Sequence, residues 1–247
     1  MATLLQFLYL FLDVKMTYYK YPRIFHFDWS DSGSSDDVWH ADADMFLGRQ
    51  VIVSEKMDGE NTSMYSDHIH ARSIDSKHHA SRSVIKAMHA RIKHHLPPNF
   101  RICGENVYAW HSILYTDLPS HFLVFGIYDA QNNCLPWDDV LEWCDILGLM
   151  TVPTLYRGVW DEKKIRSMWT GEGTFPTFEA TDPDIQFPEF PRDFEPCVAE
   201  GYVVRLADGF SYEDHINSTG KYVRPHHVQT SQYWMLRAPF PNLLGNA

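Results

Sequence analysis

One lysine in the stretch VSEKMDGENTS, residues 53–63, lies among groups suited to phosphate chemistry. Lys56 follows an apolar run typical of a buried strand, and acidic residues flank it. A lysine with its ordinary pKa near 10.4 is neutral in only about one molecule in a thousand at about pH 7.5. Lowering that pKa by about three units is equivalent to roughly 4 kcal/mol in nucleophile availability, and it requires nearby cations or desolvation. Lys56 is therefore a candidate nucleophile.

The same residues also fit a solvent-exposed hairpin. Asp58–Gly59 is a favoured pair for a type I′ turn, and Lys56 would then be solvated beside the turn. The pattern K-x-D-G is short and occurs often by chance. The choice between nucleophile and hairpin therefore depends on what the rest of the chain places near this lysine.

Composition narrows the class of protein. The chain has 247 residues, 45% hydrophobic and 15% aromatic, which is enough for one large domain with a full core. A formal net charge of -11 excludes a nucleic-acid binder that works by overall charge and leaves only a local basic face. The four cysteines form no CxxC pair, which favours a reducing, cytoplasmic setting over a disulfide framework or a structural zinc site.

Residues 1–15 are interpreted as an apolar N-terminal extension. Their apolar run is shorter than the roughly 20 residues that span a bilayer, and no basic residue precedes it as in a signal peptide. We therefore expect no membrane association. Residues 16–247 are expected to form a single domain.

The rest of the chain predicts short strands interleaved with helices, without an internal repeat. Strands are predicted at residues 50–55, 62–65, 101–108, 121–129 and 200–206. Helices are predicted at residues 81–96, 137–148 and 160–171. The proline-rich residues 175–196 predict a long surface excursion. This irregular alternation favours an α+β fold with mainly antiparallel sheets flanked by helices.

Lys56 begins an ordered series of motifs. It continues with HARS (70–73), ICGENVY (102–108), FLVFGIYD (122–129), EGYVVR (200–205) and TGKYVRPHH (219–227). The series resembles the motifs of the covalent nucleotidyltransferase superfamily of DNA ligases, RNA ligases and mRNA capping enzymes. SEKMDGEN, with YPRIFHFDWSDSGSSDD upstream and KYVRPHHVQT downstream, is most similar to the ATP-dependent RNA ligase family, in particular small ligases of viral or bacterial type.

The resemblance implies a nucleotidyltransferase domain of the ATP-grasp-like ligase adenylation type, with Lys56 taking AMP from ATP. Arg72 and Glu105 would contact the ribose and phosphate, Phe125 would stack on adenine, and Lys221 would sit on the α-phosphate. Glu200 would help to hold Mg²⁺ or Mn²⁺. The implied ATP-binding set is Glu55, Asn61, Arg72, Glu105, Phe125, Lys221 and Arg224, and Asp58 and Gly59 complete the first motif.

Two positions depart from the family pattern. The last motif usually carries two lysines one residue apart, whereas Val223 stands here at the second position and Arg224 follows it. Gly126 stands where an acid often follows the aromatic residue, although Asp129 is close by. These departures put the phosphate role of Arg224 in question.

The stretch KHHASRSVIKAMHARIKHH, residues 77–95, is the clearest basic face in this acidic chain. It predicts phosphate contacts to nucleic acid through Lys77, Arg82 and Lys86. The alternative is an ordinary solvated helix face. A metal site built from His78, His79, His94 and His95 is disfavoured because adjacent side chains on a helix point about 100° apart.

The resemblance implies an ATP-dependent RNA ligase that joins 5′-phosphate and 3′-hydroxyl ends through lysyl-AMP, acting in RNA repair in the cytoplasm, or the host cytoplasm for a viral protein. The alternatives are a DNA or hybrid nick-sealing ligase and a non-catalytic nucleic-acid-binding relative. The partner is expected to be RNA, as a nicked duplex, a hybrid or single-stranded ends. Lys221 lies 26 residues before the C-terminus, so no OB domain is expected after it.

Overall fold

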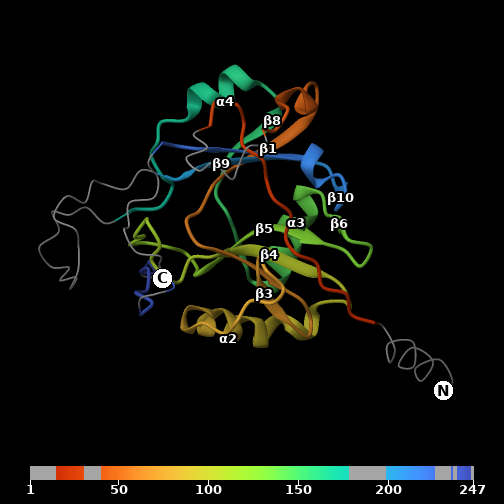
Figure 1. The fold of residues 1–247 in the computed structure, drawn as a ribbon, viewed down its shortest axis with the longest axis vertical. Helices are drawn as coiled ribbons and strands as arrows, with labels where there is room; N and C mark the ends of the chain where they lie inside the picture. Colours follow the sequence, from red (N-terminus) through yellow and green to blue (C-terminus); the bar gives the residue numbers. More distant parts are fainter. Residues whose placement is uncertain (1–14, 31–39, 178–198, 226–234, 236–237, 246–247) are drawn as a thin grey trace, which may run out of the picture.

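Two β-sheets lie one above the other in a computed structural model of the chain, which describes residues 15–30, 40–177, 199–225, 235 and 238–245 (Figure 1). Sheet A has four strands in the order β11–β9–β1–β8. Their bounds are β1 Gln50–Glu55, β8 Thr154–Val159, β9 Gly201–Leu206 and β11 Thr219–Val223. All three pairings are antiparallel, and β1 lies between β8 and β9.

Sheet B has seven strands, in the order β10–β6–β5–β4–β2–β3 with β7 beside β5. Their bounds are β2 Glu60–Met64, β3 Ile69–Ala71, β4 Arg101–Asn106, β5 Phe122–Tyr128, β6 Asn133–Cys134, β7 Met150–Thr151 and β10 Phe210–Ser211. Among the pairings between these seven strands, β5–β7 is parallel and the others are antiparallel.

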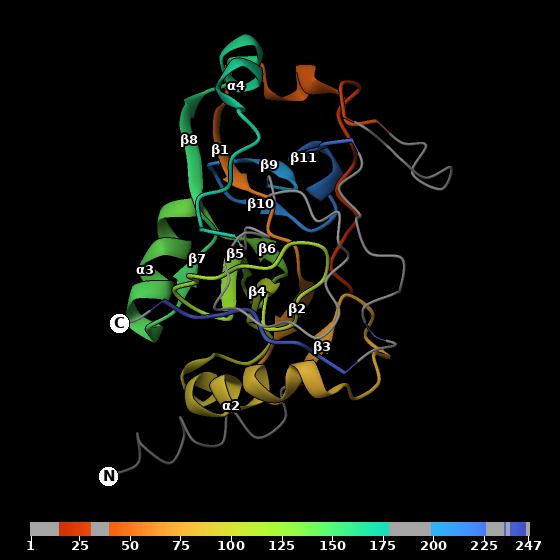
Figure 2. The ribbon, with the colours of Figure 1, turned by 90° about the vertical axis from the view of Figure 1, so that its left-hand side faces the viewer.

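Helices cover the outer sides of the two sheets (Figures 1 and 2). They are α2 Ser83–Ile92, α3 Trp137–Leu147 and α4 Glu162–Met168, with 3-10 turns η1 Ala43–Phe46, η2 Ala80–Arg82, η3 Lys93–His95 and η4 His215–Asn217. Ile85 and Ile92 of α2 and Val140 of α3 join the apolar core of sheet B. Ile165 of α4 joins a second apolar cluster with Val51 and Val53 of β1, and this cluster also includes Tyr128 of sheet B.

An N-terminal arm, residues 18–30, runs along both sheets (Figure 2). At sheet B, the Tyr19 N–H donates to the Tyr65 hydroxyl at 2.9 Å. At sheet A, the backbone of His26 forms an isolated parallel β-bridge with Lys221 of β11. The arm thus connects the two sheets along one side of the space between them.

The expected α+β class with mainly antiparallel sheets is confirmed. The strand predicted at 50–55 is confirmed as β1, and the predicted helices correspond to η2–α2–η3, α3 and α4. Strand β8 was not predicted. Residues 1–14 and 178–196 of the two predicted segments lie outside the described residues. Among the described residues, no helix is both long and apolar enough to cross a bilayer.

Candidate active site

Lys56 lies where the chain crosses from sheet A to sheet B. It directly follows β1 in sheet A, and β2 begins four residues later in sheet B. The hairpin alternative is therefore wrong, because β1 and β2 do not pair with each other. The Lys56 N–H donates to the Gly201 carbonyl at 3.0 Å, which fixes the lysine backbone against β9.

The crossing is held by Asp58. One carboxylate oxygen, Oδ2, accepts the backbone N–H groups of Ser112 and Ile113 at 2.6 and 2.7 Å. Gly59 follows in close contact with β4, where a Cβ would lie 2.6 Å from the Asn106 carbonyl oxygen. Asp58 and Gly59 therefore shape the loop, and Asp58 is not among the residues that line the neighbouring pocket.

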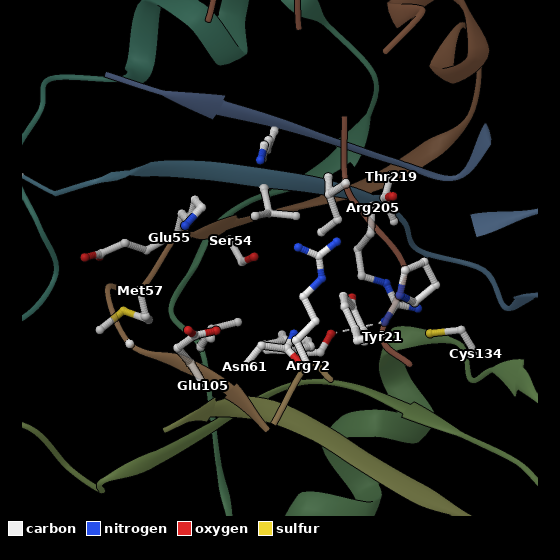
Figure 3. Close-up of a pocket in the computed structure, with 18 of the residues that line it drawn as sticks. Tyr21, Ser54, Glu55, Met57, Asn61, Arg72, Glu105, Cys134, Arg205 and Thr219 are labelled. Atoms are coloured by element: carbon white, nitrogen blue, oxygen red, sulfur yellow. Dashed lines mark hydrogen bonds between the residues drawn. The ribbon is translucent and has the colours of Figure 1, made fainter. Parts of the chain in front are cut away.

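A pocket with a volume of about 250 Å³ opens between the two sheets beside Lys56 (Figure 3). Of the implied nucleotide contacts, it is lined by Glu55, Asn61, Arg72, Glu105, Phe125 and Lys221. Figure 3 shows Arg72 reaching from the sheet B side into the middle of the pocket, with Glu55 to one side and Arg205 to the other. Side chains far apart in sequence thus converge on one cavity.

Lys56 forms an ion pair with Glu200, with its Nζ 2.6 Å from Glu200 Oε2. Burial by itself lowers the pKa of Lys56, but the charges of Glu200 and Glu105 and the hydrogen bond to Glu200 outweigh burial and raise that pKa. Without nucleotide, Lys56 is therefore a protonated ammonium group held by Glu200. The lowered pKa that a nucleophile needs must come from what enters the pocket.

The pKa of Glu105 is raised well above its ordinary value. Glu105 faces Asn61 across the β2–β4 pair. Burial and, to a smaller extent, the nearby carboxylates of Glu200 and Asp58 raise the pKa of Glu105 to about 8, although the charge of Lys56 lowers it. A neutral carboxyl group can donate as well as accept a hydrogen bond, which suits a contact with a sugar hydroxyl.

Glu55, at the end of β1, also has its pKa raised by burial, although hydrogen bonds from Thr174 lower it. Its Oε2 accepts the Thr174 N–H at 2.7 Å. Its Oε1 and the Asn61 Oδ1 are buried and make no hydrogen bond within the described residues. Two buried acceptors thus line the pocket with unused hydrogen-bonding capacity, as a ligand with donor groups requires.

Two of the predicted site residues make other contacts than those predicted for them. Arg224 does not line the pocket, and its Nε donates to the Ala199 carbonyl at 3.1 Å. Arg82, predicted to contact nucleic acid, is 6% exposed and forms a buried ion pair with Glu60. Lys77 and Lys86 are exposed, and the Lys86 Nζ is 3.0 Å from His78 Nδ1.

The pocket also contains residues to which sequence reasoning gave no role. Arg205 of β9 lines it, and its guanidinium donates to the Leu135 carbonyl at 2.7 Å. Tyr21 of the arm lines it as well, with its ring 5.0 Å from the ring of Phe125. Arg205 ends the motif EGYVVR and Tyr21 lies in YPRIF, so both stretches carried a signal, but not one that assigned these side chains.

A family model described as RNA ligase matches residues 49–223, more than two thirds of the chain. This chain belongs to the RNA ligase family. The motif series from Lys56 to Lys221 falls within the matched range. No curated protein matches the chain in sequence at a significant level.

Solved structures similar to this RNA ligase family member include a mutant of the Naegleria gruberi RNA ligase with ATP and Mn, at 15% identity and a TM-score of 0.48, covering 76% of this chain and 53% of that one. An archaeal ATP-dependent RNA ligase matches at 16% identity and a TM-score of 0.48, covering 85% and 48%. The chain thus spans about half the length of these ligases. At such values the family assignment rests on the family model.

Glu105→Gln is expected to stabilise the fold increasingly as pH rises. The Glu105 pKa is about 8 in the folded chain and about 4.3 when unfolded. Between these values the unfolded chain releases the proton first, so the wild type loses stability as pH rises. The variant lacks this titration. Linkage of about 1.4 kcal/mol per pH unit adds up to about 4 kcal/mol between about pH 5 and 8, so the melting temperature of the variant relative to wild type should rise by about 8–16 °C over this range.

Thermal unfolding followed by circular dichroism across this pH range tests the prediction. The exposed Glu142→Gln on α3 controls for the loss of one negative charge. A Glu105→Gln difference that stays constant with pH would contradict the raised pKa.

Proposed function

We propose that this chain is an ATP-dependent RNA ligase that forms a covalent lysyl-AMP at Lys56. The observation that carries the proposal is that Lys56, paired with Glu200, lines the same pocket as six implied nucleotide contacts. A solvated lysine would have no reason to lie within a converging set of this composition. The family to which the chain belongs supports the same activity.

The reaction would proceed in three steps. After nucleotide binding, Lys56 would release its proton to solvent, and the neutral amine would attack the α-phosphorus of ATP, forming an N–P bond as the P–O bond to pyrophosphate breaks. The AMP group then passes to a 5′-phosphate end and releases the lysine. Finally, a 3′-hydroxyl attacks the activated 5′-phosphate and AMP leaves.

Within the pocket, Lys221 and Arg72 would neutralise charge that develops on the α-phosphate. Phe125, packed edge-on against Tyr21, would offer its ring to the base.

The carboxylates beside Lys56 fit a magnesium ion. No cluster of three or more metal-ligating side chains occurs among the described residues, so a closed protein cage is not available there. Mg²⁺ usually takes one or two carboxylates and completes its shell with substrate phosphates and water. Glu200 would be the main ligand, with Glu105 engaged by the sugar. When bound, the ion would neutralise negative charge on the phosphate oxygens.

The proposed function is tested by the intact mass of the purified chain after incubation with ATP and Mg²⁺. We expect a gain of one adenylyl group, reversed by pyrophosphate. GTP and NAD⁺ in place of ATP define the nucleotide. If none of the three gives an adduct, the covalent mechanism is wrong for this chain.

The substrate is proposed to be RNA, as a nicked duplex, an RNA–DNA hybrid or single-stranded ends. The alternative of a DNA nick and the RNA–DNA hybrid are separated from an RNA nick by sealing assays in which each strand around a nick is RNA or DNA in turn. Sealing only when both flanking strands are DNA would exclude the RNA proposal.

The surface that we propose for RNA backbone contact lies on α2 and on the segment just before η2. The chain has no acidic residue between Asp75 and Glu105, although its net charge is -11. The exposed cations of this surface are Lys77, Lys86 and Arg91. It lies on the outer side of sheet B (Figure 1), so it would hold the nucleic acid away from the reacting ends.

Lys77→Ala combined with Lys86→Ala is expected to weaken RNA binding about tenfold and to reduce the slope of log affinity against log salt by about 1–2, because two phosphate contacts are lost. Adenylylation should be unchanged. Fluorescence anisotropy of a labelled nicked duplex at several salt concentrations measures both quantities. Lys163→Ala with Lys164→Ala, two exposed lysines on α4, is the matched control. If both double variants weaken RNA binding equally, this surface contributes only through overall charge and is not a specific RNA contact.

A further inference from the structure

The arm pairs with β11, at the edge of sheet A, through an isolated parallel β-bridge between His26 and Lys221. The Phe27 N–H donates to the Lys221 carbonyl at 2.8 Å, and the Lys221 N–H donates to the Phe25 carbonyl at 2.9 Å. On its other side, Lys221 pairs with Val203 of β9. Backbone hydrogen bonds from the arm therefore fix the residue proposed to contact the α-phosphate.

A second arm residue holds the end of the same strand. The Val223 N–H donates to the Ser30 hydroxyl at 2.9 Å, and His26 Nδ1 lies 2.7 Å from that hydroxyl. Ser30 and His26 are both arm residues, so the contact does not depend on another part of the fold. The arm thus follows β11 from Lys221 to Val223.

Phe27 packs the arm against β11. Its ring is fully buried and stacks on Trp29 with ring centroids 4.5 Å apart. The tip of the ring lies against Gly220, where a Cβ would approach Phe27 Cζ to 2.5 Å. The Phe27 ring therefore packs directly on the backbone of Gly220, and we call this contact the seat of the ring. Any other residue at position 220 would displace either the ring or the strand.

The position of Lys221 matters because a second lysine is missing from this motif. At the position of the family's second lysine the chain carries Val223, and Arg224 donates to the Ala199 carbonyl away from the pocket lining. Lys221 is therefore the cation of this strand that lines the pocket. A displacement of about 1 Å in such a group can cost about 100-fold in rate.

We propose that Phe27 is a positioning residue: seated on Gly220, it fixes the backbone of Lys221 and so places the lysine ammonium group for adenylyl transfer. The inference rests on the proposed function, in which Lys221 acts on the α-phosphate. Phe27 itself does not line the pocket, and it acts through the strand that it packs against.

Gly220→Ala tests the seat directly. The new methyl group would push the Phe27 ring and the arm away from β11, and we expect lysyl-AMP formation at saturating ATP to slow at least tenfold. Phe27→Leu removes the ring atoms that meet the methyl group. The double variant Gly220→Ala with Phe27→Leu is therefore expected to recover to within about threefold of Phe27→Leu alone.

The same substitutions in a Lys221→Ala background separate positioning from general damage. If the seat acts through Lys221, Gly220→Ala should slow Lys221→Ala by less than about twofold, because the group that it misplaces is already absent. Val140→Ala, in the core around α3, lowers the melting temperature without contacting the arm or the pocket and should leave the rate unchanged.

Hydrogen exchange provides a readout independent of catalysis. The Lys221 amide should exchange faster in Gly220→Ala and return toward wild type in the double variant. The inference is overturned if Gly220→Ala slows the reaction equally with and without Lys221, or if exchange recovers in the double variant while the rate does not. Failure of the proposed function is distinct, since the unmodified chain would then form no adduct with any nucleotide.

Discussion

Lys56→Arg is expected to leave the chain without covalent nucleotide after incubation with ATP and Mg²⁺. Arginine keeps the positive charge and reaches toward Glu200, so the ion pair and the pocket are preserved. A guanidinium group stays protonated at any working pH and cannot act as the nucleophile. We expect adduct formation to fall by at least about 10⁴-fold, the scale of loss when a covalent nucleophile is removed.

Intact mass after long incubation measures this loss, and peptide mapping of the wild-type adduct locates the modified residue. Lys56→Arg is a cleaner variant than Lys56→Ala, which would leave the carboxylates of Glu200 and Glu105 without their cation. Lys164→Arg, at an exposed position on α4, is the matched control. An adduct that persists in Lys56→Arg, or that maps to Lys221, would assign the nucleophile to another lysine.

The placement of Lys56 illustrates what the sequence determines locally. The apolar residues Val51, Ile52 and Val53 of β1 come shortly before it, and such an apolar run indicates a strand without knowledge of its partners. Helix α3 was equally readable, since acids begin it and Gly148 ends it. These signals lie within a few residues of the element that they define, which is why the predicted and observed bounds agree.

The partners of each element were not readable in the same way. The Asp58–Gly59 signal is correct for a turn, but a turn cannot say which sheet receives the next strand, and β2 joins sheet B. Strand β8 lies at the edge of sheet A with most of its side chains partly exposed, so its apolar signal is weak. The arm reaches Lys221 across almost two hundred residues, and no local pattern encodes such a contact.

The candidate site was predictable for another reason. Glu55, Lys56, Asn61 and Glu105 occupy motif positions, so the resemblance located them before their convergence could be seen. The resemblance does not show which side chains are buried. Arg82 is one of several cations in a basic stretch, and nothing in that stretch shows that its partner is Glu60, on a different element. A sequence shows where a charged residue stands, but it does not show whether that residue is buried or which residue it pairs with.

Arg82→Ala is therefore expected to act on stability and not on RNA binding. The side chains of Arg82 and Glu60 are 7% and 10% exposed, and they form a two-pronged ion pair in which Arg82 Nε lies 2.6 Å from Glu60 Oε2. Removing the arginine leaves the Glu60 carboxylate buried without its cation, which costs about 3–5 kcal/mol. In a chain of this size, that corresponds to a fall in melting temperature of about 10 °C.

Replacement of both partners distinguishes the cost of an orphaned charge from the value of the pair. Arg82→Leu with Glu60→Leu removes both charges and fills the space, and it should recover much of the stability lost in Arg82→Ala, because a buried ion pair contributes little beyond a well-packed apolar pair. Thermal unfolding measures the recovery, and anisotropy with the nicked duplex, well below the melting temperature, should give RNA affinity within about twofold of wild type. An Arg82→Ala variant that keeps its melting temperature and loses RNA affinity would instead place this side chain against RNA.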